Sequence, residues 1–232
     1  MRTYLIAGAS SGIARRITEI LHHEGHQLYV ITRHPQQLAH LQGLQFVQGN
    51  FLDDGFAPEG MPEKLDGIVY APGTINLKPF RALKPADFIH DFEVNVLGAV
   101  RLLQASHKAL KNGACASVVL FSTVAVQRGM AYHASIAAAK GAIEGLTRSL
   151  AAEWAPAIRV NAIAPSLTNT PLAARLLSSP EKEEHSAKRH PLQRVGTPDD
   201  LAAMATFLLS EHSGWITGQV FGVDGGLSTL ST

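Results

Sequence analysis

The sequence predicts one doubly wound α/β domain, in which a parallel sheet carries helices on both faces. Three observations predict it. The chain has 232 residues, of which 46% are hydrophobic and only 17% charged, which suits one well-packed core. Short apolar runs alternate with longer helical patterns, as in βαβ units. A glycine-rich turn joins the first apolar run to the first helical pattern. The domain is expected to span residues 1–232.

Each predicted element follows from its periodicity and its boundary residues. The expected strands are the short apolar runs Thr3–Ala7, Gln27–Thr32, Leu44–Gln48, Gly67–Ala71, Ser117–Ser122, Ile158–Ala164 and Val220–Val223. The expected helices are Gly12–Glu24, Ala86–Lys111, Ala134–Glu153 and Pro198–Ser210. Thr197 reads as the N-cap of the last helix, because a proline and two acids follow it.

Composition excludes several function classes. The formal net charge is +1 and basic residues are scattered, so neither nucleic acid nor an anionic membrane is an expected partner. Apolar runs fall short of the ~20 residues of a membrane span, and we expect no signal peptide ahead of the first strand. The single cysteine, Cys115, is expected to be a buried thiol and suits a reducing, cytoplasmic location. The histidines around His22 have no cluster of acids or cysteines nearby, so no metal site is expected.

The turn Gly8–Ala14 has the context that gives a glycine-rich loop meaning, with a strand before it and a helix after it. Gly8 permits a tight turn, and Gly12 lets the backbone approach a pyrophosphate. The helix that follows offers free N–H groups and a partial positive charge to that phosphate. Asn50–Asp53, after the third strand, strengthens the prediction of a dinucleotide site.

The residue after the second strand bears on the choice between NAD and NADP. An acid there would bind the adenosine ribose hydroxyls and repel a 2′-phosphate. This chain has Arg33 instead, which can bind a phosphate and stack on adenine. The sequence therefore favours NADP(H), with NAD(H) as the other possibility.

These motifs, taken in order along the chain, resemble those of the short-chain dehydrogenases/reductases, including the 3-oxoacyl-carrier-protein reductases. The turn is similar to the family's Thr-Gly-x-x-x-Gly-Ile-Gly, with Ala7 and Ala14 at two of its positions. Tyr70–Gly73 stands where the family has Asn-Asn-Ala-Gly, and Val160–Ser166 resembles its Val-Asn-x-x-x-Pro-Gly. The end of the chain, Trp215–Gly226, resembles the last strand and its Asp-Gly-Gly turn. The resemblance implies cofactor contacts from Gly8, Ser10, Ser11, Gly12, Ile13, Arg33, Asn50, Phe51, Ala71, Gly73, Lys140, Pro165, Thr168 and Thr170.

The resemblance also implies a catalytic set for carbonyl reduction or alcohol oxidation. Lys140 matches the lysine that holds the nicotinamide ribose, and Asn95 matches the helix asparagine of the proton relay. The family's serine falls on Thr123, which keeps the hydroxyl. Its neighbour Ser122 is expected to point to the other side of the strand end.

The tyrosine of this set is missing. Four residues before Lys140 stands Ile136, and none of the tyrosines Tyr4, Tyr29, Tyr70 and Tyr132 stands four before a lysine. Three interpretations remain open. Tyr132, or His133 beside it, substitutes as the acid; the chain binds the cofactor but acts as a catalytically impaired scaffold or regulator; or it transfers hydride in a reaction that needs no phenol, such as reduction of an activated alkene.

Two further features complete the expectation. The polar segment at about 171–195 is either a solvated surface segment or a substrate lid, whose Arg175, His185 and His190 meet an anionic group or face water. The two long central helices suit the family's pairing into homotetramers or homodimers. The expected partners are thus a small-molecule substrate and other copies of the chain.

Overall fold

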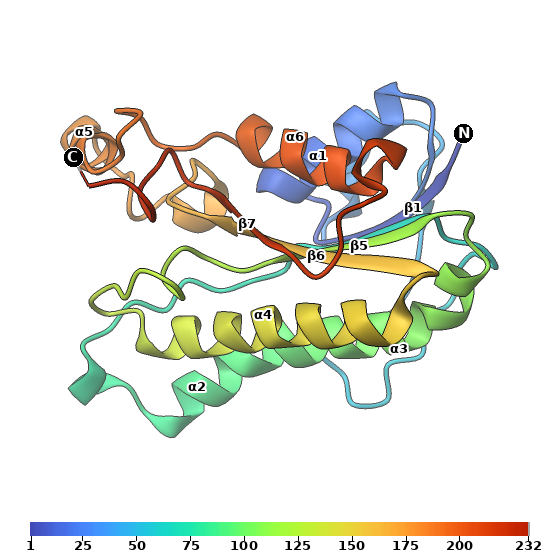
Figure 1. Ribbon diagram of the computed structural model, residues 1–232, viewed down its shortest axis with the longest axis horizontal. Helices are drawn as coiled ribbons and strands as arrows, with labels where there is room; N and C mark the ends of the chain where they lie inside the picture. The colour runs from blue at the N-terminus through green and yellow to red at the C-terminus, as the bar shows by residue number, and fades with distance from the viewer. Residues whose placement is uncertain (232) are drawn as a thin grey trace.

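The computed structural model describes residues 1–231, which form one parallel sheet of seven strands between two layers of helices (Figure 1). The strand order is β3-β2-β1-β4-β5-β6-β7, so the connection after β3 crosses to the other side of β1. The strands are β1 (Thr3–Ala7), β2 (Gln27–Ile31), β3 (Gln45–Phe46), β4 (Gly67–Tyr70), β5 (Ala116–Phe121), β6 (Ile158–Pro165) and β7 (Val220–Val223). This confirms the predicted fold class. A doubly wound sheet offers a binding crevice at the carboxyl ends of its strands, where the order reverses.

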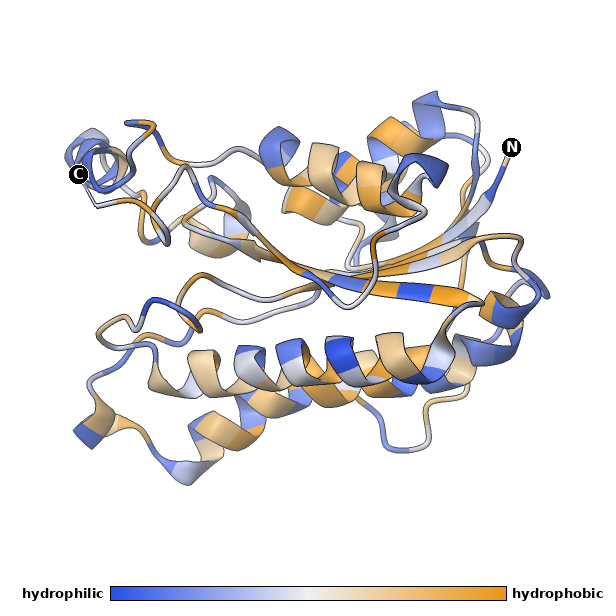
Figure 2. Cartoon of the chain, in the orientation of Figure 1, coloured by the Kyte–Doolittle hydropathy of each residue, from blue (hydrophilic) through white to orange (hydrophobic). Residues whose placement is uncertain are grey.

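The helices divide between the two faces. Helices α1 (Gly12–His23) and α6 (Pro198–Leu209) cover one face, and α2 (Pro85–Phe92), α3 (Gly98–Lys111) and α4 (Ala134–Trp154) cover the other (Figure 1). The sheet between them is largely hydrophobic (Figure 2), and two clusters of buried apolar side chains fill the space above and below it. Burial of both faces explains why the strands read as continuous apolar runs.

The long helix expected over Ala86–Lys111 is interrupted, which corrects that prediction. A π-helical turn, Glu93–Leu97, separates α2 from α3. The Asn95 side-chain amide donates to the Asp91 carbonyl at 2.7 Å. In an α-helix that carbonyl would accept from the backbone N–H of Asn95, so the side chain supports the widened turn. Such turns are frequent at functional sites.

Two smaller expectations also need correction. The third strand covers only Gln45–Phe46, because the chain beyond it leaves the sheet edge for a bridge between Gln48 and Glu59. Cys115 is exposed rather than buried, since it stands in the turn before β5 and not in the strand. The N-cap prediction is confirmed: the Thr197 side chain accepts from Asp200 N, and the Asp200 carboxylate accepts from Thr197 N in return.

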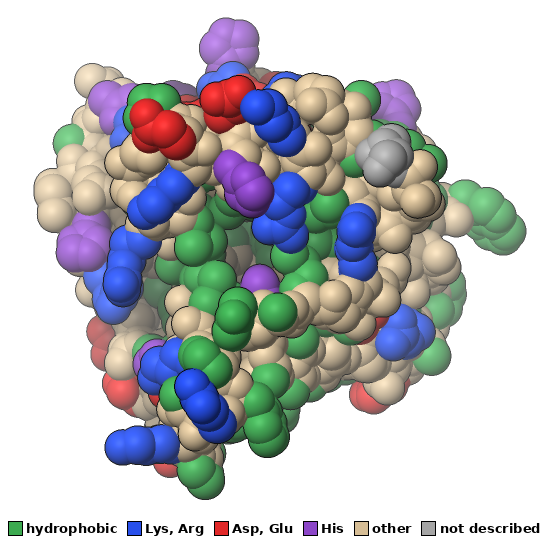
Figure 3. All heavy atoms as spheres, turned by 90° about the vertical axis from the view of Figure 1, so that its left-hand side faces the viewer, with side chains coloured by type: hydrophobic (Ala, Val, Ile, Leu, Met, Phe, Trp, Pro, Cys, Tyr) green, Lys and Arg blue, Asp and Glu red, His purple; other side chains and the backbone are tan. Residues whose placement is uncertain are grey.

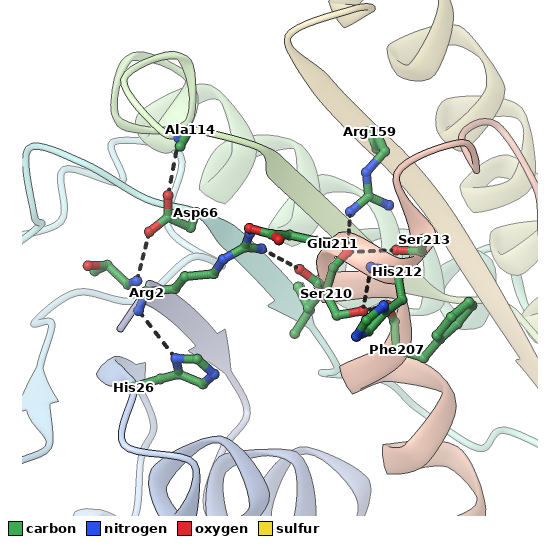
Figure 4. Close-up of polar contacts among 12 residues, drawn as sticks. Arg2, His26, Asp66, Ala114, Arg159, Phe207, Ser210, Glu211, His212 and Ser213 are labelled. Atoms are coloured by element: carbon green, nitrogen blue, oxygen red, sulfur yellow. Dashed lines mark hydrogen bonds and ion pairs between the residues drawn. The ribbon is translucent and has the colours of Figure 1, made fainter.

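The amino ends of the central strands are closed by polar contacts away from the predicted site (Figure 4). The Asp66 carboxylate accepts hydrogen bonds from the backbone N–H of Thr3 and Ala114, at 2.9 and 3.2 Å. Burial alone would raise the pKa of Asp66, but these two N–H donors keep it below its usual value. Arg2 pairs with Glu211 and links β1 to the end of α6. These contacts hold the amino ends of the strands together, and none of them lies at the carboxyl edge of the sheet.

Candidate dinucleotide site and reaction centre

The carboxyl edge of the sheet contains a tightly fitted glycine turn. Gly8 and Gly12 both have positive φ, +82° and +55°, which side chains other than glycine rarely adopt. A Cβ on Gly8 would stand 3.3 Å from Pro72 Cδ, and one on Gly12 would stand 3.3 Å from Thr170 Cγ2. The loops after β4 and β6 therefore close directly on this turn, and the glycines leave backbone free to face a ligand.

The turn also presents donors suited to a phosphate. Ser11 is the N-cap of α1 with extended backbone, and its side chain makes no capping hydrogen bond. The first turn of α1 contains no acidic residue. The helix N-terminus thus keeps its partial positive charge, and the hydroxyls of Ser10 and Ser11 stand beside it. The residues present fit the pyrophosphate of a dinucleotide.

The remaining predicted nucleotide contacts lie along the same edge. Arg33 is exposed just after β2. Asn50 is held in a turn, where its side chain donates to Asp53 Oδ1 at 2.8 Å and accepts from Leu52 N at 3.1 Å. Phe51 packs edge-on against Tyr70, with 5.4 Å between the ring centroids. Their contacts with an adenosine stay a prediction.

Tyr70 and Ala71 stand where the related family has two asparagines, and they make hydrogen bonds of their own at the end of β4. The Tyr70 phenol donates to the Val94 carbonyl at 2.6 Å and so ties β4 to the π turn. Its burial raises the pKa of Tyr70 well above the usual value, so the phenol stays protonated as a donor. Ala71 N donates to Ala7 O at 3.3 Å, which places Ala71 beside the end of β1.

Lys140 lies at the centre of the second half of the site. The side chain is buried, and Nζ donates to the Phe121 carbonyl at the end of β5 at 2.8 Å. Burial lowers the pKa of Lys140 to about 8, and the charge of Asp91 opposes that shift. A cationic lysine near neutral pH, with N–H groups left for a ligand, can bind hydroxyls or move a proton.

Ile136 lies one helical turn before Lys140 and is only 5% exposed. The two residues that follow β5, Ser122 and Thr123, have different hydrogen-bond partners. Ser122 Oγ donates to the buried Glu144 carboxylate at 2.8 Å, and is therefore engaged on the α4 side. Thr123 is half-buried, and its hydroxyl accepts from Ala125 N at 3.3 Å. The Ser122 hydroxyl is therefore already engaged, and the role of Thr123 as the substrate-orienting hydroxyl stays a prediction.

Asn95 joins Lys140 in this half of the site. A Cβ built on Gly73 would lie 3.1 Å from Asn95 Oδ1 and 3.6 Å from Lys140 Nζ. Both side chains therefore reach the same glycine, which brings β4, the π turn and α4 together. Asn95 Oδ1 is buried and has no hydrogen-bond partner within residues 1–231. An acceptor left open beside a buried ammonium indicates a ligand or water site.

Tyr132 is not brought to this centre. The residue is 59% exposed and its backbone is left-handed, with φ of 70°. The carbonyl of Tyr132 accepts from Lys78 N at 3.2 Å, which holds the loop in that position. His133, the N-cap of α4, is bonded through Nδ1 to the Ala131 carbonyl at 2.7 Å. Their role as substitute acids stays a prediction that these placements do not support.

The loop after β6 also lies at this edge of the sheet, beside the end of β5. Val124 N donates to Pro165 O at 3.1 Å, so Pro165 lies beside the Thr123 strand end. Thr168 Oγ1 donates to Ser166 O at 3.0 Å, and Thr170 Oγ1 to Thr168 O at 3.4 Å. These bonds order the segment that carries the predicted cofactor contacts Thr168 and Thr170.

The predicted lid contains a helix, α5 (Pro180–Lys188), and is anchored by His190. This histidine is 3% exposed, with Nε2 2.8 Å from Ser166 Oγ and Nδ1 2.8 Å from the Ser186 carbonyl. His190 therefore does not face water, whereas Arg175 and His185 do. The anchor encloses a cavity of about 120 Å³ between the lid and the end of β7.

Viewed from this edge, the molecule has a hollow lined with hydrophobic side chains and rimmed by lysines and arginines (Figure 3). Over residues 1–231 the structure contains no group of three or more His, Cys, Asp or Glu side chains that could hold a metal ion. Within the same residues, every helix is too short or too polar to cross a membrane.

Sequence reasoning missed Asp91. It is fully buried on α2, and its carboxylate accepts from Thr74 Oγ1 at 2.6 Å. A signal was present, because Asp91 precedes Asn95 by four residues and so shares its helix face.

Comparison with known proteins agrees with this geometry. A family model described as enoyl-(acyl carrier protein) reductase matches residues 56–228. Two tropinone reductase homologues of Arabidopsis thaliana are 31% and 32% identical over 244 residues, covering 98% of this chain and 91% and 92% of theirs. A short-chain type dehydrogenase/reductase from Mycobacterium ulcerans superposes with a TM-score of 0.88 at 27% identity, covering 98% of this chain and 90% of that one.

Proposed function

Because the chain belongs to the short-chain dehydrogenase/reductase family, we propose that it is an NADP(H)-dependent oxidoreductase that interconverts a carbonyl and an alcohol on a small molecule. That it is an oxidoreductase of this family follows from the relatives; the cofactor preference and the substrate class are the proposal. The observation that carries it is the convergence of the Gly8–Gly12 turn and the buried Lys140 on one edge of the sheet.

The chain's own residues would divide the work as follows. The glycine turn and Ser11 bind the pyrophosphate, and Thr168 and Thr170 hold the nicotinamide end. Lys140 binds the ribose hydroxyls, and Thr123 orients the substrate oxygen. NADP(H), when bound, supplies or accepts the hydride. The hydrophobic lining of the hollow excludes water from the reacting carbon.

Arg33 supports the choice of NADP(H). It stands exposed after β2, on the same edge as the glycine turn. Its guanidinium can fork onto a 2′-phosphate, as a carboxylate at that place could not. A relative fold, ElxO, has been solved with NADP bound, at 24% identity and a TM-score of 0.86; this likeness supports the fold alone.

Two measurements test the proposal. NADPH is expected to raise the melting temperature of the wild-type protein more than NADH does at equal concentration. Turnover of NADPH is then followed at 340 nm on a panel of ketones, with activated alkenes as a second panel. Reduction of alkenes alone would replace the carbonyl assignment. Tight NADPH binding without turnover on either panel would favour the scaffold or regulator.

A further proposal concerns assembly into homodimers or homotetramers. Ile89 and Phe92 on α2 are 68% and 40% exposed, and Phe80 just before it is 75% exposed. Exposed large apolar side chains within a short stretch of chain support an interface at this helix. Ile89→Lys is expected to lower the oligomer mass measured by light scattering. An unchanged mass would place the interface elsewhere.

A further inference from the structure

The buried residue of α2 is an acid. Asp91 is 0% exposed, while Ile89 beside it is mostly exposed, so this helix buries its charge and exposes an aliphatic side chain. Asp91 Oδ1 accepts from Thr74 Oγ1, but Oδ2 is buried with no hydrogen-bond partner in the described chain. Burying a carboxylate costs free energy unless an opposite charge or donors compensate for it. We therefore expect an opposite charge close to the buried carboxylate of Asp91.

The network around Asp91 leads to Lys140. Thr74, which binds Asp91, also accepts from Asn95 Nδ2 at 2.9 Å. The Oδ1 of that asparagine and Lys140 Nζ both reach the position of a Cβ on Gly73, the residue before Thr74. Helices α2 and α4 run in the same direction side by side (Figure 1). The turn that carries Asp91 thus lies beside the turn that carries Ile136.

The other charges around Lys140 are engaged elsewhere. On the same helix, Glu144 accepts from Ser122 and lies 3.9 Å from Arg148. On the π turn, Glu93 pairs with Arg101. At the start of α4 the His133 ring is bonded to a backbone carbonyl, and on α2 the His90 side chain is exposed. Asp91 is the charge that opposes the effect of burial on the pKa of Lys140.

We propose that Asp91 is the buried counter-charge of Lys140, a positioning residue that keeps Lys140 an ammonium so that its Nζ, in place of a phenol, gives the proton to the substrate oxygen. This inference rests on the proposed function. In the reduction, the carbonyl carbon accepts the hydride supplied by the cofactor, and the carbonyl π electrons move onto oxygen. That oxygen takes a proton from Nζ. The neutral amine regains a proton from solvent, which the charge of Asp91 favours.

The test begins with the cofactor-free protein. The titration of Lys140 is followed by NMR of protein labelled with ¹³Cε-lysine, and its signal is assigned as the one lost in Lys140→Arg. In the wild type it should titrate near pH 8. Asp91→Asn is expected to lower that pKa by about 1 pH unit or more, because an opposite charge nearby is lost. Asp91→Leu, which needs no buried hydrogen bond, should do the same, and Asp91→Glu should retain the wild-type titration. Glu93→Gln, a matched loss of one carboxylate on the next turn, should change nothing.

The second readout is the pH profile of NADPH turnover. The alkaline limb of kcat should follow the Lys140 titration and move to lower pH in Asp91→Asn, with recovery in Asp91→Glu. An unchanged Lys140 titration in both Asp91→Asn and Asp91→Leu overturns the counter-charge. A shifted titration with an unshifted limb overturns the proton-donor role. Failure of the wild type to bind NADPH would instead overturn the proposed function, and the titration would still decide on Asp91.

Discussion

Replacing Ile136 by tyrosine puts the missing phenol back one helical turn from Lys140. Ile136 is 5% exposed, so the larger ring enters a packed place beside α2. Overpacking of this kind costs about 1–3 kcal/mol of unfolding free energy. For a domain of this length the melting temperature should then fall by roughly 2–12 °C, at about 2–4 °C per kcal/mol. The gain is in the chemistry, because a positioned general acid contributes ~10²–10⁴-fold.

The matched control is Ile136→Phe, which adds the same ring without the hydroxyl. Both variants should lose similar stability, and both should keep the NADPH-induced rise in melting temperature. Only Ile136→Tyr should raise kcat on the best ketone substrate, by about 10-fold or more over Ile136→Phe, given the ~10²–10⁴-fold worth of a general acid and the share that Lys140 already supplies. The assay is NADPH oxidation at saturating ketone. Equal rates in the two variants would refute the placement of Ile136 at the proton-donor position.

Four further outcomes are expected. Gly12→Ala forces an alanine to adopt φ of +55° and places its Cβ 3.3 Å from Thr170 Cγ2, so it should abolish the NADPH-induced rise in melting temperature. A retained rise would contradict the proposal that the Gly8–Gly12 turn binds the pyrophosphate. Arg33→Ala should weaken NADPH binding about 10–100-fold, from a lost charged contact of ~1.5–3 kcal/mol, with little effect on NADH by calorimetry. Thr197→Ala should cost about 1 kcal/mol by denaturant unfolding through the lost N-cap. The free energy of unfolding of the wild type should rise by up to roughly 3 kcal/mol between pH 8 and 10.5, because burial lowers the pKa of Lys140 in the folded state to about 8. Lys140→Met, which has no amine to titrate, should lack that rise; a rise of the same size in both proteins would contradict this.

The fold was predictable because each signal in the sequence was local. A strand, a glycine turn and a helix N-terminus occur in order around Gly8, and the capping residues around Thr197 mark the start of α6. Side-chain alternation at the end of the expected strand predicted different directions for Ser122 and Thr123, and their hydroxyls have different hydrogen-bond partners. Cys115 was predicted to be buried because its apolar neighbours suggested a strand, whereas it is the last residue of the turn before β5 and is exposed.

The four-residue spacing between Asp91 and Asn95 did not show that Asp91 is buried. An aspartate among Phe88, Ile89 and Phe92 reads as the polar side of an amphipathic helix. Its burial depends on where the π turn rotates the helix and on what α4 offers across Gly73, and both are tertiary facts. The interruption itself was invisible to periodicity, because it consists of one widened turn supported by a side-chain amide.

Ile136 and Asp91 are best understood together. A buried lysine beside an isoleucine has lost a polar neighbour, and burial alone lowers the pKa of Lys140 toward the neutral amine. A neutral amine cannot give a proton to a substrate oxygen, so an isoleucine at this place without a second change would leave the centre without an acid. The carboxylate of Asp91, fully buried one turn before Asn95 and oriented by Thr74, supplies the opposing charge from the neighbouring helix. On this reasoning Asp91→Asn combined with Ile136→Tyr should recover more turnover than Asp91→Asn alone, because a phenol needs less from the counter-charge than an ammonium does. Equal turnover of the double and single variants would show that the two positions do not compensate for each other.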